Sequence, residues 1–367
     1  MKNIFIFILL ISADWALAQR EESPDKNRID FSKFSTHKIT LHKPSVTFNA
    51  GCMFSDIIVE DNRFDTSTLG FMHKGSVDPK SVIKLKNGFT NEIRNYLITS
   101  IDHPVSNYTV SYKLIGIVKK LWLSDEIFNE EDERYLPDTK LRKSGIIFRI
   151  EFFAEREGIY MPLYRFDTTI TGDKNVYRYG NNYIEKALMF SLSKLGSFTE
   201  NNIKQIKSKY SWKEIEQYNQ QRFNLPVLTA TTPKGVYLTF EEFKNNKPSI
   251  LDFVIKPDKK NDDIYIKDEQ GKEMLIRELY GYADGKDIFI SSAGSFFRLY
   301  RSRNSFNIFG AKSLKKVKSA NIAEKTIAGM GLVAVGSPAY LGKSHSGYNY
   351  KLRPAPFQLD METGNIY

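Results

Sequence analysis

The segment Gly145-Ile146-Ile147-Phe148-Arg149-Ile150-Glu151-Phe152-Phe153-Ala154 carries the clearest strand pattern in the chain. Ile146, Phe148 and Ile150 occupy every second position. They alternate with Ile147, Arg149 and Glu151, of which the last two are charged. A period of two predicts a β-strand with one buried face. We therefore expect a sheet around this strand.

The flanking segments predict an α+β domain over residues 38–215. Further strand-like runs lie at 57–59, 108–123 and 159–171. Apolar residues recur every three or four positions at 79–100, at 183–195 and at about 200–218, so we expect a helix in each of these segments. Thr199 is expected to cap the third helix. This order is typical of an antiparallel sheet that is covered on one side by helices.

The second half, residues 235–367, predicts a mostly β domain that is a meander, a sandwich or barrel-like. Residues 216–234 are expected to link the two domains, because Pro226 and Pro233 interrupt regular structure. The sharpest turn signal is Asp284-Gly285, which favours a two-residue type I′ hairpin that pairs Tyr282 with Asp287.

The first eighteen residues predict a signal peptide. Lys2 precedes a short apolar run, and Ala16-Leu17-Ala18 has the small-x-small pattern of a cleavage site. Residues 19–37 are polar and are expected to be a flexible lead-in. Cys52 is the only cysteine, which favours a bacterial envelope or secreted protein over an extracellular eukaryotic one. We expect an exported protein that is periplasmic, associated with the outer membrane or secreted.

No motif predicts a catalytic, cofactor-binding or metal site. The five histidines lack the spacing of a convincing metal site, and no Gly-x-Ser-x-Gly elbow occurs. Carboxylate runs such as 130–133 and Glu241-Glu242 leave open a hydrolase of an envelope polymer or glycan, although a solvated turn and a helix N-terminus are the favoured explanations. The trio Asp61, Arg63 and Asp65 predicts an ion-paired turn or a binding rim.

The net charge of +10 favours an anionic lipid, an acidic glycan or an envelope protein as partner. Export argues against nucleic acid, and the sequence predicts no oligomeric state. Aromatic side chains that line an exposed sheet face would bind a sugar or a partner protein. Aromatic side chains that are buried would fill the core. The candidates for this binding surface are Tyr280, Tyr282, Phe297 and Tyr300, together with Trp122 and Phe296.

Residues 327–341 are apolar and rich in glycine and alanine. Small residues of this kind let helices pack closely in lipid, so association with a membrane through this segment is one hypothesis. Pro338 interrupts the segment, which favours the alternative of a buried strand or loop.

Three segments resemble signatures of uncharacterised exported proteins of the Bacteroidetes, and they span most of residues 235–364. They are Gly235-Val236-Tyr237-Leu238-Thr239-Phe240-Glu241-Glu242-Phe243-Lys244-Asn245-Asn246-Lys247-Pro248-Ser249, Gly281-Tyr282-Ala283-Asp284-Gly285 and Leu359-Asp360-Met361-Glu362-Thr363-Gly364. The resemblance implies export but no activity.

The first domain more weakly resembles, in pattern, the auxiliary lipoproteins of envelope lipid transporters. The points of likeness are the Asp61-x-Arg63 turn, the strand at 108–120 and the helix around Ala187-Leu188, but the lipid-anchored cysteine of those proteins is missing. The sequence therefore predicts a non-catalytic binding or assembly module of the bacterial envelope. A hydrolase and a membrane-associated protein are the alternatives.

Overall fold

The computed structural model is a β-rich α+β structure with 45% strand and 24% helix. It describes residues 29–44, 47–48, 53–72, 81–101, 111–127, 143–257, 262–267, 270–292, 295–311 and 354–367. Residues Met1–Phe34 and Ser35–Tyr367 are two separate compact units. The first contains the short 3-10 helix η1 (Phe31–Lys33), which Asp30 caps. The predicted signal peptide and residues 327–341 lie outside the described residues.

A four-stranded sheet in the order β2-β5-β6-β7 is the centre of the larger unit. Its strands are β2 (Phe54–Asp61), β5 (Tyr112–Ile127), β6 (Lys143–Arg156) and β7 (Ile159–Gly172). The strand predicted over 145–154 is β6, and the prediction is confirmed. The prediction of a purely antiparallel sheet is wrong, because β2 runs parallel to β5. A parallel neighbour requires a crossover, and the chain between β2 and β5 supplies it with two short strands and a helix.

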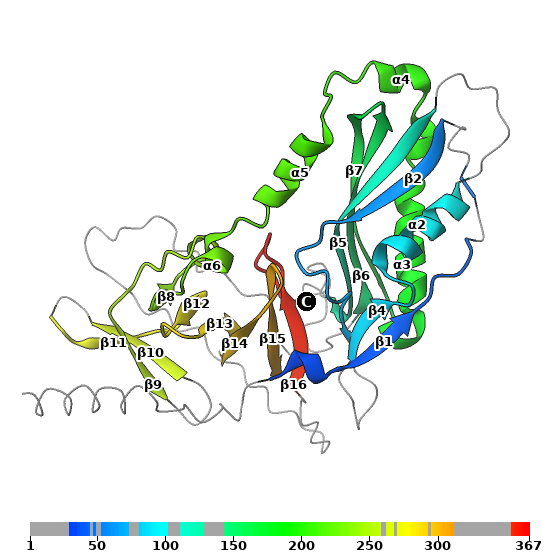
Figure 1. Cartoon of the computed structure of the whole chain (residues 1–367). Coiled ribbons are helices and arrows are strands. Elements are labelled where there is room, and N and C mark those ends of the chain that lie inside the picture. Colours follow the sequence, from blue (N-terminus) through cyan, green and yellow to red (C-terminus); the bar gives the residue numbers. More distant parts are fainter. Residues whose placement is uncertain are drawn as a thin grey trace, which may run out of the picture. The chain divides into compact units, whose positions relative to one another are not determined.

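Helices α2 (Phe89–Ser100) and α3 (Val176–Leu192) cover one face of this sheet (Figure 1). Leu97 of α2, Leu188 of α3 and Phe148 of β6 are fully buried in the same apolar cluster. Each helix therefore turns its apolar stripe towards the sheet, as the spacing of three and four residues predicts.

The helix predicted over 79–100 is half wrong. Its first part is the strand β4 (Ser81–Leu85), in which alternate side chains are buried. Gly88 then adopts a φ of 89° and serves as the N-cap of α2. Few residues other than glycine accept this conformation, so the helix begins only after it. Strand β4 lies between β1 (Ser35–Ile39) and β3 (Phe71–Met72) in a three-stranded sheet.

The helix predicted over 200–218 is also interrupted. Thr199 caps α4 (Glu200–Lys204) as expected, but α5 (Trp212–Gln221) begins only after Ser211, which caps it with Glu214 in a capping box. Between the two helices the chain is extended at Tyr210. The short 3-10 helix η3 (Leu195–Ser197) precedes α4.

Helix α5 lies on the second face of the central sheet. Its buried Ile215 and its half-buried Trp212 pack on Ile115 of β5 and Phe153 of β6. The sheet therefore has helices on both faces, and the prediction that helices cover one side only is wrong. The helix predicted over 200–218 overlaps only part of α5, and its pattern could not show which face of the sheet the helix would join.

The remaining strands form two antiparallel sheets. The larger has the order β16 (Pro354–Leu359), β15 (Ser305–Ala311), β14 (Ser295–Ser302), β13 (Ile288–Ser292), β12 (Gly281–Ala283) and β8 (Gly235–Tyr237). The smaller has the order β11 (Glu273–Ile276), β10 (Asp262–Lys267) and β9 (Phe253–Pro257). Two short helices accompany them, α6 (Pro226–Thr229) and α7 (Phe240–Lys244).

The hairpin at Asp284-Gly285 exists, but its predicted register is wrong by two residues. Tyr282 pairs with Phe289, and their rings stack with centroids 4.8 Å apart. The loop is therefore four residues long. Asp284 Oδ1 accepts hydrogen bonds from the backbone N–H groups of Lys286 and Asp287, which favours this longer turn. A slip of two residues leaves every side chain on its own face, so the apolar pattern could not distinguish the two registers.

Candidate functional site

The aromatic candidates do not form one exposed surface. Tyr280 and Tyr282 are both 1% exposed and belong to two different apolar clusters. These two side chains fill the core, and the prediction that they present a binding surface is wrong. Phe297 and Tyr300 are half-buried on β14. Binding through these two side chains stays a prediction.

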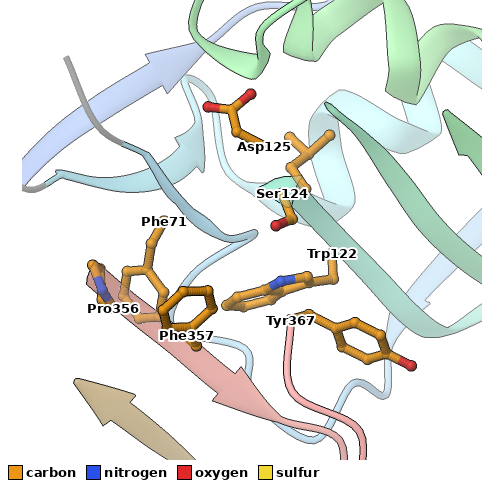
Figure 2. A pocket seen from close by; sticks show the side chains of 8 residues that line it. Phe71, Trp122, Ser124, Asp125, Pro356, Phe357 and Tyr367 are labelled. Carbon is orange, nitrogen blue, oxygen red and sulfur yellow. The ribbon is translucent and has the colours of Figure 1, made fainter. Parts of the chain in front are cut away.

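Trp122 lies in the wall of a small pocket of about 20 Å³ (Figure 2). The pocket is lined by Phe71, Trp122, Leu123, Ser124, Asp125, Pro356, Phe357 and Tyr367. Trp122 is 5% exposed, and its indole Nε1 has no hydrogen-bond partner in the described structure. The volume suits one water molecule and no larger ligand.

A cluster of charged side chains joins the central sheet to the C-terminal turn. Glu362 Oε1 lies 2.7 Å from Arg222 Nη2, and Glu362 Oε2 lies 3.6 Å from Lys120 Nζ and contacts Arg149 Nη1. Lys120 also pairs with Asp360. The cations are at most 15% exposed in their side chains. Each carboxylate is therefore neutralised in a largely buried network.

The pKa of Glu362 shows how strong this environment is. Burial raises the pKa, but the charges of Lys120, Arg222 and Arg149 and the hydrogen bond from Arg222 outweigh it and hold the pKa at about 2. Glu362 is therefore ionised at neutral pH. A carboxylate with such a low pKa suits a structural ion pair and not a general acid, which needs a pKa near the working pH.

Lys119 lies beside this cluster at a register shift of β5. Its side chain is 2% exposed, its Nζ lies 3.3 Å from Glu151 Oε2, and it donates to Asn219 of α5. Burial lowers its pKa to about 8, with a further contribution from Arg222, although the charge of Glu151 opposes the shift. The amine is covered by α5, so these contacts attach the helix to the sheet.

The trio Asp61, Arg63 and Asp65 forms an ion-paired turn, one of the two predicted alternatives. Both Arg63 Nε and Nη2 lie 2.8 Å from the Asp61 carboxylate in a bidentate pair. Asp65 accepts from Ser302 Oγ at 2.7 Å and from Gln358 Nε2 at 3.0 Å. The turn therefore ties β2 to strands β14 and β16.

The predicted carboxylate pairs serve local structure where the structure describes them. Glu241 and Glu242 lie in the first turn of α7, and Glu242 Oε2 accepts from the backbone N–H of Leu238 at 2.8 Å. Residues 130–133 lie outside the described residues. In the part of the chain that is described, no group of three or more histidine, cysteine or carboxylate side chains is placed to hold a metal ion.

A different surface, which the sequence did not single out, combines exposed apolar side chains with lysines. Strands β6 and β7 are joined by Glu157 and Gly158, both with positive φ. The next residue, Ile159, is 44% exposed, and Tyr210 is 40% exposed. Tyr160 holds Tyr210 in place through two backbone hydrogen bonds of 2.8 and 2.9 Å. We call Ile159, Tyr210 and the lysines near Tyr210 the tip surface.

Three lysines give the tip surface positive charge, and Glu157 in the adjoining turn pairs with Arg156. Lys207, Lys209 and Lys213 lie within three residues of Tyr210 along the chain and are exposed. None of the three forms an ion pair with another described residue. The nearby Glu214 is occupied by Ser211, whose backbone N–H lies 2.7 Å from its Oε2. The lysines are therefore available to an anionic partner.

Local contacts fix the tip surface. The ring of Trp212 lies 5.4 Å from that of Tyr160, and Gly158 N–H donates to Glu155 Oε1 at 2.8 Å. The two-residue turn was detectable in the sequence, since only four residues separate the strands predicted at 145–154 and 159–171. The approach of Tyr210 was not, because the segment was predicted to be helical.

No protein-family model matches the chain, and neither a curated protein nor a solved structure matches it. None of the helices that the structure describes is long and apolar enough to cross a membrane.

Proposed function

We propose that the protein is a non-catalytic binding module of the bacterial envelope that docks on an anionic lipid surface through the tip surface. The observation that carries the proposal is the pairing of Tyr160, which follows exposed Ile159, with exposed Tyr210, which has three exposed lysines within three residues along the chain. Aliphatic and aromatic side chains partition into the interfacial region of a bilayer, and lysines are attracted to phosphate headgroups.

An anionic lipid fits better than an acidic glycan because of the exposed apolar groups. A polymer of sugars would satisfy the lysines but gives Ile159 no apolar environment. Each lysine near an anionic membrane contributes about 1 kcal/mol, so three lysines give a weak, reversible attachment that salt reduces. Avidity or a second contact would be needed for permanent attachment.

The proposal includes the expectations drawn from the sequence. Residues 1–18 direct export, and the mature protein is periplasmic, associated with the outer membrane or secreted. It belongs with the exported Bacteroidetes proteins that share its three signatures. Residues 38–215 form an α+β domain with a helix-covered sheet and residues 235–367 a mostly β domain, joined by 216–234.

Vesicle sedimentation tests the docking proposal. The chain from residue 19, the form that export leaves, is mixed with vesicles of neutral phosphatidylcholine or with vesicles containing phosphatidylglycerol. We expect binding to the anionic vesicles only, with an affinity that falls as salt is added. Replacing the three lysines by glutamate should reduce the affinity at least tenfold, and Ile159→Asp should reduce it in high salt as well.

The matched control changes the same number of charges elsewhere. Lys84, Lys86 and Lys194 are also exposed, and their replacement by glutamate should leave more of the binding intact than replacement at the tip. Equal losses from the two triple variants would mean that net charge alone drives binding. Binding to an acidic polysaccharide that competes with vesicles and does not depend on Ile159 would replace lipid with glycan as the partner.

A further inference from the structure

Strand β7 is one of the two edge strands of the central sheet, and much of its outer edge is unpaired in the part of the chain that the structure describes. Among the described residues, β7 pairs with β6 along its length and with Tyr210 only at Tyr160. Tyr160 both donates to and accepts from Tyr210, so its backbone groups point away from β6. The backbone of Pro162 also points away from β6, but proline has no N–H to donate.

The register of β7 shows which later residues point outward. Phe153 pairs with Pro162 and Phe152 with Tyr164, so Leu163 is absorbed in a bulge. Backbone groups alternate between inward and outward along an antiparallel strand. Beyond the bulge the outward positions are therefore Arg165, Asp167, Thr169 and Thr171.

We propose that two copies of the chain pair their β7 strands antiparallel about a two-fold axis at Phe166, which forms a dimer with one continuous sheet. The axis places Arg165 opposite the partner's Asp167, and Asp167 opposite the partner's Arg165. Both side chains are accessible, at 48% and 43% exposure, and within one chain Arg165 Nη2 lies 3.2 Å from Asp167 Oδ2, so both charges lie on the same face of the edge. An isologous edge with opposite charges on either side of its axis is self-complementary.

The apolar side chain at the axis supports the same register. Phe166 is half-buried and packs against the cluster between sheet and helices, 6.4 Å from Phe148 between ring centroids. In the dimer it meets the partner's Phe166 at a position without backbone hydrogen bonds, where side chains are closest. An axis at Thr168 would instead place both charges opposite threonines. Towards the start of β7, Pro162 and the bulge at Leu163 limit the pairing between the two β7 strands.

Register-specific cross-linking tests the dimer. In a Cys52→Ser background, Phe166→Cys should form a disulfide-linked dimer under mild oxidation, because directly opposite Cβ atoms are about 4.5–5.5 Å apart. Thr168→Cys, which the axis places opposite the partner's Tyr164, is the matched control and should not cross-link. Circular dichroism confirms that both variants are folded. Equal cross-linking of the two would overturn the proposed register.

Sedimentation velocity of the chain from residue 19 over a concentration series provides the second test. We expect a dimer that Arg165→Asp weakens at least tenfold, because it sets two carboxylates opposite each other, whereas Lys84→Asp has little effect. A monomer at every concentration, or an Arg165→Asp dimer as strong as the parent, would overturn the proposal. The edge shares no residue with the tip surface, so loss of vesicle binding by the tip variants leaves this result unchanged.

Discussion

Arg222, which directly follows α5, donates a 2.7 Å hydrogen bond to Glu362 of the C-terminal turn, 140 residues later in the chain. Arg222 also donates to the backbone carbonyl of Asn62 at the end of β2, at 3.0 Å. One guanidinium therefore joins the helix on the second face of the central sheet, the end of β2 and the last residues of the chain. Planar, multidentate binding of this kind is characteristic of arginine.

Glu362→Gln should destabilise the protein by about 3 kcal/mol. The substitution removes the negative charge that Lys120, Arg149 and Arg222 share, and it leaves the largely buried Arg222 without an ion pair to another described residue, whereas Lys120 keeps Asp360. Urea denaturation followed by circular dichroism measures the loss. Glu157→Gln is the control, since that side chain is 76% exposed and its pair with Arg156 contributes little. A loss no larger than that of the control would show that the cluster does not hold the turn.

The same cluster predicts a loss of stability in acid. The pKa of Glu362 is about 2 in the folded chain and near its ordinary value of 4.5 when unfolded. The unfolded chain therefore binds more protons between these values, so this contribution is complete above pH 4.5 and is lost as the pH falls towards 2. Urea midpoints measured from pH 7 to pH 3 should fall less steeply in Glu362→Gln than in the parent. Parallel curves would contradict the assignment.

Gly281→Ala should destabilise the larger C-terminal sheet by about 3 kcal/mol or more, because an added Cβ would lie 2.2 Å from the backbone oxygen of Phe289 on the neighbouring strand. The strands must separate to accommodate it. Gly271→Ala is a useful comparison, since a Cβ there meets nothing within 4 Å and only the φ of 77° opposes it. Thermal unfolding should rank the two variants, with Gly281→Ala well below Gly271→Ala.

The sequence predicted those features that depend on neighbouring residues. The alternation from Ile146 to Ile150 identified β6, and Thr199 was correctly assigned as a helix cap, because both signals come from local geometry. The parallel pairing of β2 with β5 and the contact between Arg222 and Glu362 depend on residues far apart in the chain. No periodicity specifies such partners, so they could not be predicted.

The candidate site was predicted less well than the fold. Aromatic residues such as Tyr280 suit a core and a binding surface equally, and only burial distinguishes the two roles. The tip surface went unnoticed because its lysines were assigned to a long helix, in which Tyr210 would not have reached Tyr160. The backbone hydrogen bonds between these two tyrosines assemble the surface, and they join parts of the chain that are 50 residues apart.

Trp122→Phe should change the free energy of unfolding by less than about 1 kcal/mol, although the side chain is 95% buried. The indole N–H makes no hydrogen bond to a described residue, so its removal breaks none within that part of the chain. A phenyl ring preserves most of the contact with Phe71, whose ring lies edge-on to the indole at 5.5 Å. Trp122→Ala, in contrast, empties the site and should destabilise by about 3–5 kcal/mol. Urea denaturation of both variants checks the contrast, and a loss in Trp122→Phe close to that in Trp122→Ala would contradict the prediction.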